Sequence, residues 1–163
     1  MKENADKIIL DVCCGGRMMW FDKKHPSVLF VDKREIDIEK LKDGSNFEVK
    51  PDIIMDFCKL DLPDNQFNLV VFDPPHMVNV GKNSVIGKKY GILDRENWQE
   101  DIKQGFAECF RVLKPNGVLI FKWNEYDIPV NRILELTPVK PLFGHRSGRS
   151  SKTHWIAFIK QNL

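Results

Sequence analysis

The chain has 163 residues with 42% hydrophobic and 29% charged residues and a formal net charge of +2. These values are typical of a globular protein, and we expect residues 1–163 to form one domain with one core. No stretch approaches the roughly 18 apolar residues that a membrane span requires, and the polar start has no export signal, so we expect a cytoplasmic protein.

Apolar runs and breakers alternate along the chain in a strand, helix, strand order. This pattern predicts an α/β fold with a mostly parallel sheet and helices on both faces. The last two predicted strands are separated by a Ser, Gly and Arg turn, which is typical of an antiparallel hairpin at a sheet edge. The predicted strands are Lys7–Val12, Val28–Asp32, Ile53–Asp56, Leu69–Asp73, Val118–Trp123, Lys140–His145 and His154–Lys160.

The clearest predicted helix is Trp98–Leu113, because apolar residues recur on one face at helical spacing. Asn97 and Glu100 have the spacing of a capping box, and Lys114-Pro115-Asn116-Gly117 predicts the end of the helix. The aromatic residues of this helix are expected in the core.

The segment Met77–Leu93 has neither helical nor strand periodicity. It carries three glycines and no acid before Asp94, and its composition predicts a mobile basic loop. We expect Lys82, Lys88, Lys89 and Tyr90 of this loop to contact the substrate.

The first predicted strand ends in Asp11 and continues into a loop of small residues, Val12-Cys13-Cys14-Gly15-Gly16. Small residues let a ligand approach backbone amides closely. The loop lacks the GxGxxG spacing that favours a nicotinamide dinucleotide. By itself, this pattern fits either a ligand-binding loop or a structural turn.

The second and third predicted strands also end in acids. In doubly wound sheets, an acid at the position of Asp32 accepts hydrogen bonds from the ribose hydroxyls of an adenosine ligand. Asp56 could accept from an adenine amine, and Phe57 could cover the ring. Three strand ends therefore predict one nucleoside pocket.

The fourth predicted strand runs into Asp73-Pro74-Pro75-His76, a rigid turn at the edge of the sheet where such folds bind ligands. The Asp73 carboxylate and the Pro74 carbonyl could both accept from one exocyclic amino group and aim its nitrogen at an electrophilic methyl. These four residues are the predicted catalytic turn, with Asp73 as a positioning acceptor.

Together, the four strand ends resemble the class I S-adenosylmethionine-dependent methyltransferases. More narrowly, four segments resemble small methyltransferases carried by bacterial phages and prophages, and the likeness spans most of the chain. These segments are Asp11–Lys23, Phe72–His76, Arg111–Glu125 and Gly144–Trp155.

The resemblance implies a Rossmann-like, doubly wound, seven-stranded sheet whose last strand is antiparallel, and S-adenosyl-L-methionine as cofactor. Amino-methylating relatives usually carry Tyr, Phe or Trp where this chain has His76, which has less area for stacking on a base. No target-recognition domain is evident. The expected cofactor-binding residues are Asp11, Cys13, Gly15, Gly16, Asp32, Lys33, Asp56 and Phe57.

Positive charge is concentrated toward the C-terminal end, where no acid follows Glu135. This asymmetry favours an anionic partner, and Arg146, Arg149 and Lys152 are expected to hold phosphates. The leading hypothesis is an amino-methyltransferase of nucleic-acid bases, with DNA favoured over RNA and adenine over cytosine. The alternatives are an RNA base methyltransferase and a weakly catalytic cofactor-binding interaction protein.

The four cysteines have no CxxC spacing and no histidine at a zinc-like distance. We therefore expect reduced thiols, no metal site and no cysteine chemistry.

Overall fold

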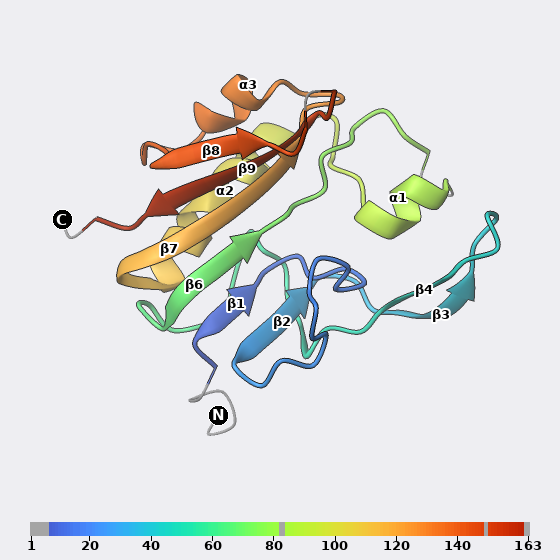
Figure 1. Cartoon of the computed structure of the whole chain (residues 1–163), viewed down its shortest axis with the longest axis horizontal. Coiled ribbons are helices and arrows are strands. Elements are labelled where there is room, and N and C mark those ends of the chain that lie inside the picture. The colour runs from blue at the N-terminus through green and yellow to red at the C-terminus, as the bar shows by residue number, and fades with distance from the viewer. Residues whose placement is uncertain (1–6, 82–83, 149, 162–163) are drawn as a thin grey trace.

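The computed structural model describes residues 7–81, 84–148 and 150–161. They form a seven-stranded sheet and a separate two-stranded sheet (Figure 1). The spatial order of the large sheet is β5 (Ile53–Ile54), β2 (Val28–Asp32), β1 (Ile9–Asp11), β6 (Phe67–Phe72), β7 (Leu113–Asn124), β9 (Thr153–Ile159) and β8 (Phe143–Arg146).

The five strands from β5 to β7 are parallel, whereas β9 runs antiparallel to both of its neighbours. The predicted Rossmann-like sheet with an antiparallel last strand is therefore confirmed. Several strand ends differ from the prediction. The largest difference is in β7, which begins at Leu113 rather than Val118, because the chain pairs Leu113 with Phe67 before a register shift.

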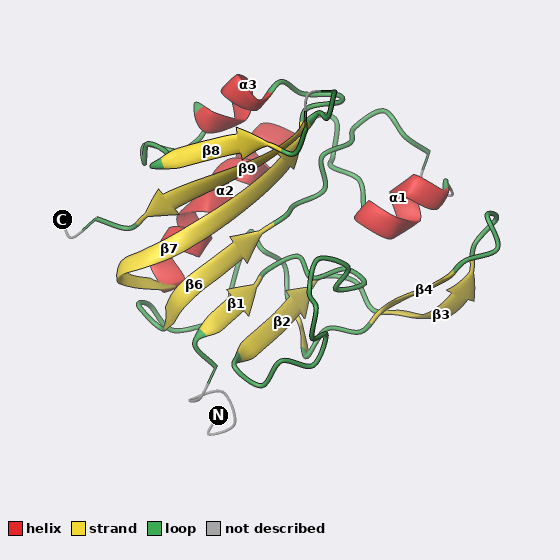
Figure 2. Ribbon diagram, viewed as in Figure 1, coloured by secondary structure: helices red, strands yellow, loops and turns green. Residues whose placement is uncertain are grey.

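The predicted helix is confirmed as α2 (Trp98–Val112), which lies across one face of the large sheet (Figure 2). Its buried face meets an aromatic cluster in which the Phe106 and Phe121 ring centroids are 4.9 Å apart. A Cβ atom at position 105 would lie 2.6 Å from the Phe72 ring, so Gly105 permits the close approach of helix and sheet. Among the described residues, no helix is both long and apolar enough to cross a membrane.

The predicted capping box at the start of α2 is wrong. The Asn97 side chain makes no capping hydrogen bond. Instead, the Asp94 carboxylate accepts from the backbone N–H groups of Glu96 and Asn97 at 2.8 and 3.1 Å. The side chain of Asp94 thus satisfies backbone N–H groups of the turn that precedes the helix, a role that the sequence analysis assigned to Asn97.

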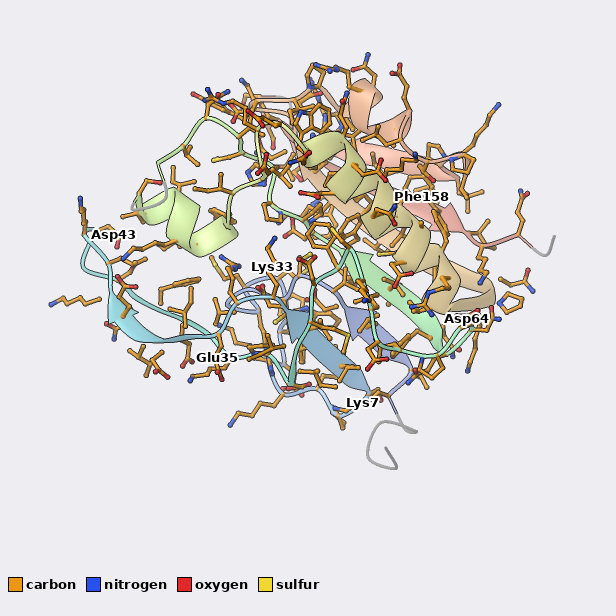
Figure 3. All side chains as sticks on the ribbon, turned by 180° about the vertical axis from the view of Figure 1, so that it is seen from behind. Lys7, Lys33, Glu35, Asp43, Asp64 and Phe158 are labelled. Atoms are coloured by element: carbon orange, nitrogen blue, oxygen red, sulfur yellow. The ribbon has the colours of Figure 1, made fainter. Side chains whose placement is uncertain are left out.

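The helices cover the sheet unevenly, which differs from the expectation of helices on both faces. The helix α3 (Val130–Leu134) lies on the same face as α2, and its Arg132 guanidinium is 5.3 Å from the Trp98 ring centroid. Figure 3 shows the molecule from behind relative to Figure 1, and in this view α2 lies in front of the large sheet. On the opposite face, Trp20 from a loop packs edge-on against Phe30, and Trp155 is 37% exposed.

The interpretation of Met77–Leu93 as a loop without regular structure is wrong. The segment contains α1 (Val85–Tyr90), whose first turn is capped by the Ser84 hydroxyl accepting from Gly87 N–H at 2.9 Å. This helix packs against a hairpin that the sequence analysis missed, β3 (Ile36–Lys40) and β4 (Asn46–Val49). Ion pairs and a small apolar cluster hold the helix in place.

Candidate functional site

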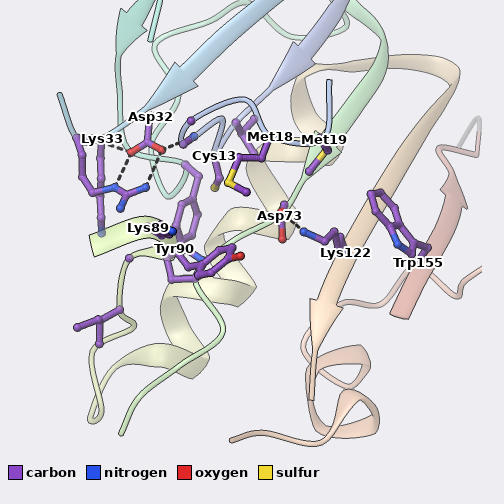
Figure 4. A pocket seen from close by; sticks show the side chains of 18 residues that line it. Cys13, Met18, Met19, Asp32, Lys33, Asp73, Lys89, Tyr90, Lys122 and Trp155 are labelled. Atoms are coloured by element: carbon purple, nitrogen blue, oxygen red, sulfur yellow. Dashed lines mark hydrogen bonds and ion pairs between the residues drawn. The ribbon is translucent and has the colours of Figure 1, made fainter. Parts of the chain in front are cut away.

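A pocket of about 340 Å³ opens at the carboxyl ends of β1, β2, β6 and β7 (Figure 4). Parallel strands of an open α/β sheet meet at this edge, which is where such folds bind ligands. The pocket brings together predicted site residues from separate parts of the chain. These are Cys13, Gly15, Gly16, Asp32, Lys33, Phe57, Asp73, Pro75, Lys89 and Tyr90.

The small-residue loop after β1 forms one wall of the pocket, as the sequence predicts. Gly15 has a φ of 47°, in the left-handed region that favours glycine, and its N–H donates to Asp32 at 2.9 Å. A Cβ atom at position 16 would lie 3.3 Å from the Phe47 ring. The loop therefore follows a path that larger residues would strain.

The carboxylate of Asp32 lies at the end of β2, and both of its oxygens are engaged. Its Oδ1 accepts from the backbone N–H and the Nε of Arg34, at 2.9 and 3.0 Å. Its Oδ2 accepts from Gly15 N–H and from the Arg34 guanidinium at 2.9 and 3.2 Å. A carboxylate offers about four lone-pair positions, so a ligand hydroxyl must replace one of these donors.

Asp11 lies beneath the pocket and does not line it. It is 1% exposed and accepts from Trp20 Nε1 at 2.7 Å and from Cys13 N–H at 3.2 Å. Burial raises the pKa of the Asp11 carboxyl to about 7. Through these two hydrogen bonds, Asp11 holds the loop that follows β1.

Of the predicted Asp56–Phe57 pair, only Phe57 lines the pocket. Asp56 instead accepts from Cys58 N–H at 3.0 Å and lies 3.7 Å from the Lys33 ammonium. The same ammonium is 5.8 Å from the Phe57 ring centroid. Phe57 is only 3% exposed and packs against Phe72 in the core, so this end of the pocket offers one cation and little aromatic surface.

Asp73 follows β6 and forms an ion pair with Lys122 of β7, with Oδ2 and Nζ 2.6 Å apart (Figure 4). The Asp73 and Lys122 side chains are 18% and 24% exposed. Burial raises the pKa of the Asp73 carboxyl, and the Lys122 ammonium offsets part of this rise. The site thus holds a partly buried carboxylate in a fixed position.

The proline turn after Asp73 is held by the end of α1. Gly91 has a φ of 76°, and a Cβ atom at that position would lie 3.0 Å from Pro75 Cγ. The left-handed backbone and the close approach both require glycine there. Pro75 lines the pocket, whereas Pro74 does not.

His76 lies behind the pocket wall and is only 9% exposed. Its ring centroid is 5.7 Å from that of Tyr90 and 6.3 Å from that of Trp123. Burial and the nearby Lys122 charge lower the pKa of His76 to about 4, so the imidazole is neutral at pH 7. It packs under Tyr90 and offers little area to a substrate.

Two other predicted substrate residues, Lys88 and Lys89, form ion pairs with acids of the segment that contains β3 and β4. The Lys89 ammonium lies 3.1 Å from Asp43, and Lys88 pairs with Glu39 on β3. Lys82 lies outside the described residues, as does Arg149.

The two remaining predicted phosphate-binding residues do not line the pocket. Arg146 pairs with Glu125, whose carboxylate is also 3.0 Å from His154. The Lys152 ammonium lies 4.5 Å from the Tyr126 ring centroid. Both cations therefore contact the loop that follows β7.

No family model matches the chain. It is 36% identical over 67 residues to the type II methyltransferase M.BglII of Bacillus subtilis, which covers 41% of this chain and 17% of that protein. It is 32% identical over 80 residues to the type II methyltransferase M.HpaI of Haemophilus parainfluenzae, covering 46% and 23%. The matched stretches span less than a quarter of each relative's length.

A TehB-like S-adenosylmethionine-dependent methyltransferase from Corynebacterium glutamicum superposes with a TM-score of 0.58. The superposition covers 96% of this chain and 81% of that chain at 17% identity. The chain has the class I methyltransferase fold. At this identity the likeness concerns the fold alone, and the chemistry rests on the pocket.

The pocket residues that the sequence analysis missed include three with a polar or large aromatic side chain, namely Arg34, Lys122 and Trp155. Lys122 is a charged residue in an otherwise apolar predicted strand, and it stands at the strand end where ligands bind. That signal was available in the sequence. Arg34 and Trp155 had no comparable signal, because basic and aromatic residues near turns are common.

Proposed function

We propose that the chain is an S-adenosylmethionine-dependent methyltransferase that acts on an exocyclic amino group of a nucleic-acid base. DNA is favoured over RNA, and adenine over cytosine. The observation that carries this proposal is a single pocket that extends from Asp32 to Asp73. Its two ends have the acceptors that an adenosine ribose and a substrate amino group require. The similarity to two type II methyltransferases supports the same activity.

The residues of the pocket fit the cofactor. Asp32 would accept from ribose hydroxyls, Phe57 would border the adenine ring with the small part of its surface that is exposed, and the backbone of Gly15 and Gly16 would permit close approach of the methionine part. The cations Lys33 and Lys89 already pair with Asp56 and Asp43. The pocket therefore has no large excess of positive charge that would oppose a sulfonium ligand.

The bound cofactor supplies an electrophilic methyl group on a sulfonium sulfur. Asp73 would accept a hydrogen bond from the substrate amino group, so that the nitrogen lone pair faces the methyl; the predicted second acceptor, the Pro74 carbonyl, belongs to a residue that does not line the pocket. The ion pair with Lys122 keeps the carboxylate in place before the substrate enters. Catalysis then depends mainly on alignment, since the methyl group would already be activated by the sulfonium and the amino group has only to release one proton once the nitrogen–methyl bond replaces the sulfur–methyl bond.

The proposal is tested with labelled S-adenosylmethionine and separate pools of single-stranded DNA, duplex DNA, RNA and small molecules. Label is expected in DNA, on N6 of adenine more than on N4 of cytosine. Label only in RNA would favour the RNA base methyltransferase. Label only in small molecules would contradict a nucleic-acid substrate, and tight cofactor binding without any transfer would favour an interaction protein.

Removal of the Arg34 side chain is expected to strengthen cofactor binding. Its guanidinium donates two of the four hydrogen bonds on the Asp32 carboxylate, which are the positions that ribose hydroxyls would take. We expect Arg34→Ala to bind S-adenosylhomocysteine about fivefold more tightly, a change of roughly 1 kcal/mol, by calorimetry. Arg132→Ala on α3 is the matched control. Weaker binding by Arg34→Ala would mean that the guanidinium contacts the cofactor instead.

The rate of methyl transfer is expected to fall as the pH falls through the Asp73 pKa, because a protonated carboxyl is a poorer acceptor. Burial raises this pKa and the Lys122 ammonium lowers it. Loss of the ammonium should raise it further, so Lys122→Met is expected to move the acidic limb of the kcat profile to higher pH. Lys103→Met on the exposed side of α2 is the control. An acidic limb that stays in place would exclude Asp73 as the titrating group.

A further inference from the structure

Trp155 lies at the rim of the pocket, on the face of the sheet that no helix of the described residues covers. It is 37% exposed, whereas Trp123 on the neighbouring strand is fully buried. Trp155 pairs in register with Lys122, so both side chains leave the sheet on the same face. A large aromatic ring thus stays accessible beside the pocket.

The contacts of Trp155 connect it to the proposed reaction centre. The Lys122 ammonium is 2.6 Å from Asp73 Oδ2 and 5.6 Å from the Trp155 ring centroid. In Figure 4, Asp32 and Trp155 lie on opposite sides of Asp73. The ring is therefore on the side of Asp73 away from the predicted ribose site.

His76 cannot supply the aromatic surface, because it is buried under Tyr90. Tyr90 also lines the pocket, but in Figure 4 it lies on the same side of Asp73 as Asp32. Phe57 belongs to the predicted adenine end. Among the described aromatic residues of the pocket, Trp155 is the one placed toward an acceptor.

We propose that Trp155 is the platform on which the planar acceptor base stacks while Asp73 holds its amino group. This inference rests on the proposed function and specifies its acceptor as a planar heteroaromatic ring. The strand β9 holds the indole on the sheet, so little of its freedom is lost on binding. Base stacking on an aromatic side chain has a substantial effect on affinity that depends little on base identity.

The first test compares Trp155→Ala with wild type in steady-state kinetics. The KM for a single-stranded oligodeoxynucleotide is expected to rise roughly 10- to 100-fold, while the affinity for S-adenosylhomocysteine stays the same. Trp155→Phe is expected to restore most of the affinity, because it keeps a ring. The control is Phe143→Ala, which removes a 68% exposed ring from the same sheet face outside the pocket.

An unchanged KM in Trp155→Ala would overturn the inference and leave the proposed function standing. A weaker affinity for S-adenosylhomocysteine, equal to the loss for the oligonucleotide, would also overturn it, since the ring would then contact the cofactor or support the fold.

A second test needs no turnover. Wild type loaded with S-adenosylhomocysteine is titrated with the oligodeoxynucleotide and with deoxyadenosine, and the tryptophan fluorescence is followed. Quenching that is present in wild type and absent in Trp155→Phe is expected. Equal quenching in both proteins, or none in wild type, would overturn the inference. Quenching at Trp155 without any methyl transfer would leave this binding site intact and contradict the proposed function.

Discussion

Replacement of Asp73 by alanine is expected to lower kcat by roughly 10²- to 10³-fold, the usual loss when one preorganised electrostatic contact to the reacting group is removed. The reason is positional, since the carboxylate that would orient the substrate amino group is lost. The affinity for S-adenosylhomocysteine is expected to change by less than about threefold, because Asp73 forms no part of the predicted ribose or adenine contacts. Single-turnover rates and calorimetry measure the two quantities separately.

Asp73→Asn is the matched variant for this prediction. It keeps a side-chain carbonyl that can accept a hydrogen bond, and its loss in kcat is expected to be smaller than that of Asp73→Ala. Both variants remove the negative charge that pairs with the Lys122 ammonium, so thermal melts should accompany the kinetics. If both variants retain wild-type kcat, Asp73 has no part in the reaction.

Replacement of Asp32 by alanine is expected to weaken cofactor binding and leave kcat nearly unchanged, the opposite of the result expected for Asp73→Ala. The affinity for S-adenosylhomocysteine should fall by about 30- to 100-fold, or roughly 2–3 kcal/mol, through the loss of hydrogen bonds to a charged acceptor. At saturating cofactor, kcat should stay within about threefold of wild type, since the lost contact is a binding contact.

Asp64→Ala serves as the control for Asp32→Ala. Asp64 also pairs with an arginine, Arg111, but it is 66% exposed and does not line the pocket. Equal losses of kcat and cofactor affinity in both the Asp32 and the Asp73 variants would contradict the separate roles assigned to the two acids.

Much of the fold was predictable because the strong signals are local. The apolar run of β2 and the helical periodicity of α2 each lie within one short segment, and a parallel sheet brings strand ends to one edge. Gly15, Asp32, Phe57 and Asp73 were therefore predicted together, and the structure brings them to one pocket. The helix α1 was not predicted, since it is only six residues long and depends on packing against the β3–β4 hairpin.

The sequence by itself determined the order of the strands and which acids and small residues follow them near the pocket. Only the tertiary structure decided which of these groups face a ligand. Asp73 meets Lys122 across 49 residues of chain, and strand register places Trp155 beside Lys122 on an uncovered face. Packing of α1 and Trp123 buries His76. These outcomes depend on register and packing between distant segments, which local residue patterns do not encode.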